Sequence, residues 1–339
     1  TNLNSITFFK IRRTDDLRKF DITRFATLPC SKRDSSGSAY LVRFLLSDPE
    51  ALGYNFSVRE IFKNTELHFT ASLGDGSDGS VYDAKFRGSR FAVKIQKPGK
   101  TSLAEEKNVL IALKDIQGVP RLATNPLFTT WPFKEAMFLE TLGEHKNLTE
   151  ELACSLVDTL VAIHAKGYLH RDVRPSNIMT TAGADGKRSA LLIDFGAAVK
   201  IAEAEAVYRG TFSTASDKVL QHIISSSWEM YVATESDDYV ALVRSMMLIL
   251  FPVLTERLRM AYFRREGGVS INNNATRARR LLKFWDDERE NNQGFPKAAV
   301  KIYTNAIEAA EKGDAEALKE HICCLYHLVV VCDFSWAPT

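Results

Sequence analysis

The sequence lacks the features that identify a membrane-spanning, disulfide-stabilised or strongly charged protein. Its longest apolar runs are interrupted by Arg244 or His327 and fall short of the roughly 20 residues that a spanning helix needs. Its five cysteines are odd in number and irregular in spacing, which favours reduced thiols in an intracellular setting over a disulfide framework. Cys323, Cys324 and Cys332 lie in an apolar stretch, so we expect them in a core rather than at a metal. With 44 basic and 42 acidic residues the formal charge is only +2, so we expect neither a nucleic-acid partner nor a membrane partner.

What remains is the composition of an ordinary globular protein. The 339 residues are 45% apolar and 25% charged, which is enough for a large core in one two-lobed unit or in two domains. Residues 1–65 contain no motif, only an apolar run at 6–9 with the composition of a strand. We expect this segment to be an extension that packs on the domain after it. The first residue is Thr1 rather than Met, so we expect a fragment of a longer chain.

Two carboxylates and one amide stand out because each lies at a turn beside an apolar segment. Asp172 and Asn177 lie in a polar loop, and Asp194 ends the apolar run at 190–193. Such a set suits a site that holds magnesium and positions a hydroxyl for phosphoryl transfer. Asp172 would accept or orient the proton of the nucleophile. Asn177 and Asp194 would ligate the metal ions that bridge the phosphates of ATP.

The order of these residues is the signature of a known family. His-Arg-Asp with an Asn five places after the Asp, followed by Asp-Phe-Gly, is typical of protein kinases. The chain therefore resembles the eukaryotic protein-kinase superfamily from about residue 66 to about residue 250. The resemblance implies an α+β fold with two lobes: a small antiparallel β-sheet N-lobe of five strands with one helix, and a mainly helical C-lobe. The expected boundaries are 1–65 for the extension, 66–143 for the N-lobe and hinge, and 144–339 for the C-lobe with a divergent helical end.

The N-lobe motifs of the family can be followed upstream. Residues 73–81 contain Gly-x-Gly-x-x-Gly-x-Val, and glycines allow a backbone to approach phosphate closely. By resemblance Lys94, in the apolar run 91–95, meets the α- and β-phosphates. In the helical pattern from 101 to 113, Glu106 is the expected partner of Lys94, with Glu105 as the rival candidate.

The hinge is expected at 136–143, where the family reads adenine through main-chain groups. An amphipathic helix from 151 to 167, ended by Gly167, would then lead into the catalytic loop. The nucleotide contacts implied by the resemblance are Gly74, Gly76, Gly79, Val81, Ala92, Lys94, Glu106, Glu140, Leu142 and Met179. The implied catalytic residues are Asp172, Lys94, Arg174, Asn177 and Asp194.

The chain departs from the family after the catalytic loop. Arg174 stands where most members have lysine, and it keeps the charge on a wider, planar head. The segment from Gly196 to Gly210 is short, and Ala-Ser-Asp ending at Asp217 replaces the usual Ala-Pro-Glu. Asp217 is still a candidate to anchor the segment to an arginine. The candidate phosphosites are Tyr208, Thr211, Ser213 and Thr214, with Arg171 as the reader of the phosphate.

The region after residue 236 divides into familiar and unfamiliar parts. Asp238 resembles the buried aspartate that braces the catalytic loop of the family, but a carboxylate at a helix start explains it nearly as well. Two further helices are expected at about 298–312 and 315–331. The Asp-Asp-x-x-x-Leu-Val-Arg-Ser sequence at 237–245, Phe-Trp at 284–285 and Gly-Asp at 313–314 resemble crinkler-type effector kinases of filamentous microbes or related fungal kinases. The crinkler-type alternative would place the protein in the host-cell nucleus. A basic cluster either serves nuclear import or docking or is a solvated face, the latter being favoured: Arg277, Arg279, Arg280 and Lys283.

These observations predict an active protein kinase, of serine/threonine specificity, that binds ATP and Mg²⁺, phosphorylates a protein substrate and itself, and resides in the cytoplasm or nucleus. Two rivals share the motifs. One is a nucleotide-binding pseudokinase or scaffold, in which the unusual activation segment fails to accept substrate. The other is a kinase for small molecules, against which Arg171 and the Gly-Thr element at 210–211 count.

Overall fold

The structure is a computed structural model that divides the chain into two units, residues 1–65 and residues 66–339. It describes residues 5–13, 20–29, 39, 42, 62, 65–75, 79–96, 103–130, 133, 136–144, 148–182, 186–203, 205–225, 230–263, 273–290 and 297–331. In the first unit β1 (Ser5–Arg13) pairs antiparallel with β2 (Phe20–Pro29), so the apolar run at 6–9 lies within a strand. The expectation that residues 1–65 pack on the following domain stays a prediction.

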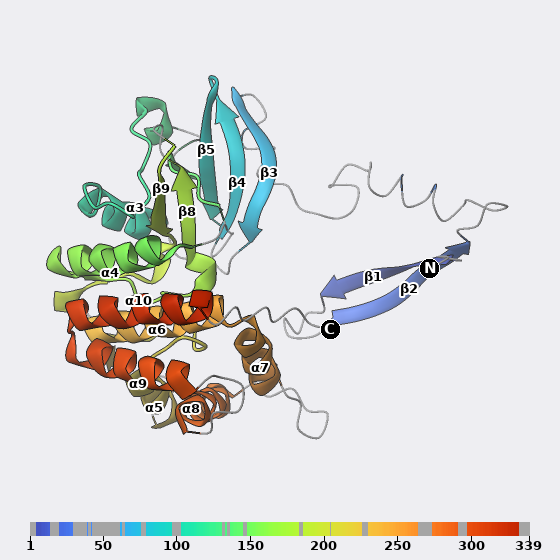
Figure 1. The fold of residues 1–339 in the computed structure, drawn as a ribbon. Helices are drawn as coiled ribbons and strands as arrows, with labels where there is room; N and C mark the ends of the chain where they lie inside the picture. Colours follow the sequence, from blue (N-terminus) through green and yellow to red (C-terminus); the bar gives the residue numbers. More distant parts are fainter. Residues whose placement is uncertain are drawn as a thin grey trace. The chain divides into compact units, whose positions relative to one another are not determined.

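The second unit begins with a twisted antiparallel sheet (Figure 1). Its described strands, in spatial order, are β3 (Leu67–Asp75), β4 (Gly79–Phe86), β5 (Ser89–Gln96) and β6 (Ala136–Leu139). One face of the sheet is filled by aromatic side chains, among which the rings of Phe128 and Phe138 stack with centroids 3.9 Å apart. Aromatic packing of this kind makes the sheet a rigid support for the residues on β5.

The prediction of five strands in this sheet is wrong for the described residues, which form four. In place of a fifth strand, a single antiparallel bridge joins Leu122 to Leu139. Pro120 has no N–H to donate to a ladder. Asn125 then turns the chain, because its side chain accepts a hydrogen bond from the N–H of Leu127 at the start of the 3₁₀ helix η1 (Pro126–Thr129). Two punctuating residues so close together leave no room for a strand.

The remainder of the second unit is mainly helical and is built around one buried helix. The helices are α3 (Leu103–Ala112), α4 (Glu150–Ala165), α5 (Asp217–Ser225), α6 (Glu235–Leu250), α7 (Pro252–Phe263), α8 (Asn274–Glu290), α9 (Lys297–Lys312) and α10 (Ala315–Val331). In α6 the whole stretch from 237 to 248 is buried, because α4, α9 and α10 pack around it (Figure 1). The small antiparallel sheet and this helical part confirm the expected α+β class.

The predicted amphipathic helix is α4. Leu156, Leu160 and Ile163 are buried on one stripe, and Gly167 adopts a φ of 80° after the helix end. A residue with a side chain is strained at that φ, so glycine ends the helix here and lets the chain turn into the catalytic loop. Among the described residues no single helix has the length and apolar composition to cross a membrane. Only α6 and α7 taken together do, and that pair is bent by 112°.

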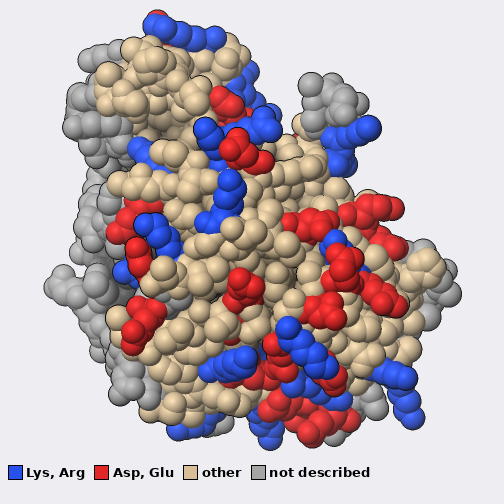
Figure 2. Space-filling model, turned by 90° about the vertical axis from the view of Figure 1, so that its left-hand side faces the viewer, with Lys and Arg blue, Asp and Glu red and all other residues tan. Residues whose placement is uncertain are grey.

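Short paired segments connect the sheet to the helices and hold the loops of the candidate site. They are β7 (Tyr168–Leu169) with β10 (Val199–Lys200), β8 (Ile178–Ala182) with β9 (Arg188–Leu192), β11 (Glu205–Ala206) with β12 (Tyr231–Val232), and the 3₁₀ turns η3 (Pro175–Asn177), η4 (Phe195–Ala197) and η5 (Ile201–Glu203). On the face drawn in Figure 2, the described Lys and Arg side chains are interspersed with Asp and Glu. The expectation of no nucleic-acid partner stays a prediction.

Candidate active site

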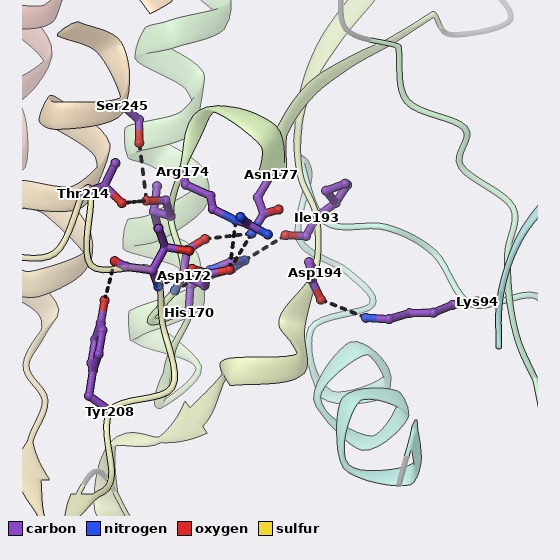
Figure 3. A network of polar contacts seen from close by, with 12 residues as sticks. Lys94, His170, Asp172, Arg174, Asn177, Ile193, Asp194, Tyr208, Thr214 and Ser245 are labelled. Carbon is purple, nitrogen blue, oxygen red and sulfur yellow. Dashed lines mark hydrogen bonds and ion pairs between the residues drawn. The ribbon is translucent and has the colours of Figure 1, made fainter. Parts of the chain in front are cut away.

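Lys94, Glu106 and Asp194 meet although they come from three different elements. Lys94 lies on β5, Glu106 in the first turn of α3, and Asp194 directly after β9. The Lys94 Nζ lies 2.8 Å from Glu106 Oε2. It also lies 2.8 Å from Asp194 Oδ1, a contact drawn in Figure 3. The Glu106 side chain is 7% exposed, whereas Glu105 is exposed. Of the two rival glutamates, the structure therefore pairs Glu106 with Lys94.

The three side chains adjust one another's protonation. Burial acts to lower the pKa of Lys94, but the attraction of Glu106 and Asp194 outweighs it and raises that pKa. Burial acts to raise the pKa of Asp194, but the charge of Lys94 holds it below the ordinary value. At neutral pH the ammonium and the Asp194 carboxylate are both charged. The group is thus prepared to exchange one of its partners for a phosphate or a cation.

Asp172 is held by contacts from both sides of its carboxylate. Asn177 Nδ2 donates to Asp172 Oδ2 at 3.0 Å and to the Asp172 carbonyl at 2.9 Å, while the N–H of Thr211 donates to Oδ1 at 2.8 Å. The Nε of Arg174 lies 3.2 Å from Oδ2 as an ion pair. These contacts fix the direction of the Asp172 carboxylate. In the view of Figure 3, Asp194 lies between Asp172 and Lys94.

The catalytic loop owes its shape to Asp238, a fully buried carboxylate at the start of α6. Its two oxygens accept the backbone N–H groups of His170 and Arg171, each at 2.8 Å, and Oδ2 also lies 3.0 Å from His164 Nε2. Arg171 is in the left-handed region with a φ of 66°, which costs free energy for a residue with a side chain. Asp238 stabilises that conformation, so its role as a helix-start carboxylate is not the whole account.

His170 joins the catalytic loop to the turn that carries Asp194. The N–H of Asp172 donates to His170 Nδ1 at 3.2 Å, so the ring proton sits on Nε2, which donates to the Ile193 carbonyl at 3.1 Å. The His170 ring also meets the Phe195 ring with centroids 4.7 Å apart. Asp194 itself has a φ of 67°. His170 therefore links the backbone of Asp172 to the backbone of Ile193, the residue before Asp194.

The activation segment is ordered by contacts to Arg171. This arginine is 6% exposed, donates to the Val207 carbonyl at 2.7 Å, and lies 6.0 Å from the ring of Tyr208. Gly210 passes so close to the Arg171 carbonyl oxygen that a Cβ would overlap it. Among the proposed phosphosites Thr214 is only 2% exposed and donates to the Val173 carbonyl, so in this conformation it is not accessible to a kinase.

Asp217 anchors the end of the activation segment, in the manner expected from the sequence. Its carboxylate pairs with Arg244 of α6 and Arg289 of α8. The Arg244 guanidinium is fully buried and lies 4.8 Å from the Trp285 ring, and Trp285 Nε1 donates to the Ser213 carbonyl at 2.9 Å. A single carboxylate with two guanidinium partners thus joins three elements.

The remaining predicted nucleotide contacts are only partly gathered. Ala92 is buried on β5, and Gly74, Gly79 and Val81 flank the β3–β4 connection. Met179 packs against Gly143, where a Cβ would lie 2.6 Å from its sulfur. Glu140 is exposed and Leu142 half-buried. Gly76, at the tip of the connection, lies outside the described residues.

Comparison with known proteins also indicates a relationship to protein kinases. A segment of the chain is 33% identical over 147 residues to the serine/threonine-protein kinase TIO of Arabidopsis thaliana. Another match is 30% identical over 173 residues to a probable serine/threonine-protein kinase of Dictyostelium discoideum. The chain is related to the protein-kinase superfamily. A probable casein kinase I homolog of Encephalitozoon cuniculi is also similar, at 27% over 141 residues.

Each of these matches covers only part of the chain and part of the relative. They cover 39%, 42% and 37% of the chain, and 11%, 34% and 43% of the three relatives in the same order. The chain thus spans less than half the length of each of these relatives. No protein-family model matches the chain.

Sequence reasoning missed one member of the site, His164. His164 lies on the buried stripe of α4, where a histidine that only packs in the core is the ordinary expectation. The structure places His164 Nδ1 3.2 Å from the Tyr239 hydroxyl and Nε2 3.0 Å from Asp238. A buried polar side chain needs a hydrogen-bond partner. A histidine at a buried position of a predicted helix, together with a predicted buried aspartate elsewhere in the sequence, is the signal that could have revealed this contact.

Proposed function

We propose that the chain is an ATP-dependent protein kinase that transfers the γ-phosphate to serine and threonine hydroxyls. The observation that carries the proposal is the joining of two groups into one site: Lys94, Glu106 and Asp194 on one side, and Asp172 with Asn177 on the other. The first group suits the binding of nucleotide phosphates. The second suits the orientation of an attacking hydroxyl.

Each residue has a role that its contacts support. Asp172 would accept the proton of the hydroxyl, because its carboxylate is fixed in direction and only partly exposed. Arg174, beside Asp172, would neutralise charge on the transferred phosphoryl group in place of the lysine of most family members. Lys94, held by Glu106, would bind the α- and β-phosphates.

The oxygen atoms of Asn177 and Asp194 fit a divalent cation. Asn177 donates its amide nitrogen to Asp172, so its amide oxygen is the atom that can face a metal. Carboxylate and amide oxygens are ligands that Mg²⁺ prefers, and when bound Mg²⁺ would neutralise phosphate charge. The choice of Mg²⁺ over another hard cation is part of the proposal.

Serine/threonine specificity and autophosphorylation follow from the loop and the segment beside it. The sequence Arg-Pro-Ser-Asn at 174–177 resembles the Lys-Pro-x-Asn of serine/threonine kinases. The relatives named above carry serine/threonine kinase or casein kinase in their names. Residence in the cytoplasm or nucleus is also part of the proposal. An effector role in a host cell is proposed from the resemblance of the region after residue 236 to crinkler-type effector kinases.

The test is transfer from γ-labelled ATP by the purified chain, with phosphosite mapping. We expect phosphoserine or phosphothreonine in the wild type and a loss of roughly 10²-fold or more in Lys94→Met, because a phosphate-binding charge is removed. Lys85→Met, at an exposed position of the neighbouring strand β4, is the matched control and should retain the rate.

Nucleotide binding measured by calorimetry separates the alternatives. ATP binding without transfer in the wild type would overturn the proposal in favour of a pseudokinase. Phosphate on a small hydroxylated molecule but never on protein would favour the small-molecule kinase. Unchanged transfer in Lys94→Met would show that the site is assigned to the wrong residues.

A further inference from the structure

A pair of cysteines faces each other at the contact between α4 and α10, away from the catalytic residues. Cys154 lies on α4 and Cys323 on α10, and their Sγ atoms are 2.8 Å apart. A disulfide bond is about 2.05 Å long, so the sulfurs need to approach by only about 0.8 Å to form one. Both residues are half-buried, which leaves a path for a small oxidant.

The two sulfurs are opposite each other because the two helices have a fixed register. The helices pack side by side (Figure 1), and three contacts repeat at every fourth residue in opposite directions along them. At one end of the series, Lys319 Nζ lies 2.5 Å from Asp158 Oδ1 as an ion pair. In the middle, Cys323 faces Cys154. At the other end, His327 Nδ1 lies 3.8 Å from Glu150 Oε2, which is an ion pair when His327 is protonated. Residues four apart lie on one face of a helix, so the cysteines occupy the middle rung of an antiparallel ladder.

We propose that Cys154 and Cys323 are a redox site. They form a disulfide bond with each other when they react with glutathione disulfide or a similar low-molecular-weight disulfide. This bond joins α10 to α4, the helix that leads into the catalytic loop. This inference does not depend on kinase activity. The expectation that Cys323 and Cys324 lie in a core is wrong, because Cys323 is only half-buried and Cys324 is exposed; Cys332 lies outside the described residues.

The reaction proceeds in two exchanges. The thiolate of one cysteine of the pair attacks one sulfur of glutathione disulfide, forms a mixed disulfide and releases one glutathione. The thiolate of the other cysteine then attacks the protein sulfur of this mixed disulfide and displaces the second glutathione. The two protein thiols lose two electrons and two protons, and glutathione disulfide takes up both to become two glutathione molecules.

Burial of the two thiols slows the exchange. It raises the pKa of Cys154 to about 12, and the nearby Cys323 and Glu150 add to the shift. Burial also raises the pKa of Cys323. Little of either thiol is therefore ionised at neutral pH, so the exchange is slow compared with that of an exposed thiol.

Cys324 supplies the internal comparison. It is the next residue on α10 but is exposed, so it should form a glutathione adduct and no bond to Cys154. The full chain is equilibrated in buffers with increasing ratios of oxidised to reduced glutathione. Free thiols are then blocked, and the digested chain is analysed by mass spectrometry. We expect a peptide pair that joins residue 154 to residue 323, is two hydrogens lighter than the separate thiols, and disappears with dithiothreitol.

The melting temperature provides a second measurement. The new bond closes a long loop, so the oxidised chain should melt roughly 5 °C or more above the reduced chain. That shift should vanish in Cys154→Ser and in Cys323→Ser and persist in Cys324→Ser. Recovery of both cysteines as free thiols while Cys324 carries glutathione would overturn the proposal. So would a glutathione adduct that stops at Cys323, or a bond between Cys323 and Cys324.

Discussion

At the residue scale, the sequence predicted that Asp172 and Asn177 lie together because one short motif contains both. Asp172 and Asn177 lie five positions apart on one loop, and their hydrogen bond is local. The choice between Glu105 and Glu106 was not local, since it depends on which face of α3 turns toward β5. The structure distinguishes the two, because Glu106 is buried and forms an ion pair with Lys94, whereas Glu105 is exposed.

The contacts of Asp238 show the opposite case. Its partners His164, His170 and Arg171 are 67 to 74 residues away along the chain. No local pattern distinguishes an aspartate with such partners from one that begins a helix. The pKa of Asp238 is held low by its hydrogen bond and ion pair with His164 and by His170, against the opposing effect of burial. Its charge is therefore kept in the folded protein, and the loop keeps its acceptor.

The neighbouring glutamates offer a matched pair for testing the site. Glu106→Gln removes the charge that holds Lys94, so we expect the rate of phosphoryl transfer to fall by roughly 10²-fold. Glu105→Gln has the same chemistry one position earlier on an exposed face and should change the rate by less than about twofold. Steady-state transfer from labelled ATP measures both. Equal effects of the two substitutions would contradict the assignment of Glu106.

At the element scale, the activation segment is the part that the sequence described least well. Its last residues departed most from the family pattern, yet Asp217 does bind arginine. The two partners, Arg244 and Arg289, come from helices 27 and 72 residues further along the chain, so the pattern could name an anchor but not its partners. The missing fifth strand has a local cause in Pro120 and Asn125, and there the sequence contained the answer.

The Asp217 anchor makes a prediction about acid stability. Burial acts to raise the pKa of Asp217, but the charges of Arg244 and Arg289 hold it below the ordinary value. A carboxylate with a depressed folded-state pKa stabilises the protein above the unfolded-state pKa of about 4, and this contribution is lost as the pH falls through the folded-state value.

Asp217→Asn should therefore lower the free energy of unfolding at pH 7 by about 3 kcal/mol, because two guanidinium groups lose their counter-charge. The difference from wild type should shrink as the pH falls below about 4, because the unfolded wild-type chain then binds a proton, and the difference is lost once the pH passes the lower folded-state pKa. Urea unfolding of both proteins at a series of pH values measures this. A difference that stays constant from pH 7 to pH 3 would show that the effect of Asp217 is steric rather than ionic.

At the scale of the whole molecule, the sequence predicted the helices well and their packing poorly. The helices expected at about 298–312 and 315–331 correspond to α9 and α10. Apolar periodicity reveals where a helix runs, but it does not reveal which neighbour covers its apolar face. The pairing of α10 with α4, and the burial of α6 from 237 to 248 by several helices, depend on contacts between distant segments and were not predicted.

The last prediction concerns how much of the chain is needed for a folded core. The largest buried apolar cluster runs from Leu103 to Tyr326, and the described strands of the sheet begin at Leu67. Contacts divide the chain between Thr65 and Glu66. A chain of residues 66–339 should therefore unfold in a single cooperative transition and retain ATP binding, because all of these elements are kept.

The melting temperatures of the two chains then test the expectation that residues 1–65 pack on the kinase-like unit. Packing that stabilises by 1 kcal/mol would raise the melting temperature of the full chain by roughly 2–4 °C over that of 66–339. Calorimetry on both proteins, each with and without Mg-ATP, gives this shift and the cooperativity together. Non-cooperative unfolding of 66–339, or loss of its ATP binding, would mean that the core depends on residues before Glu66 and that the boundary at this position does not separate folding units.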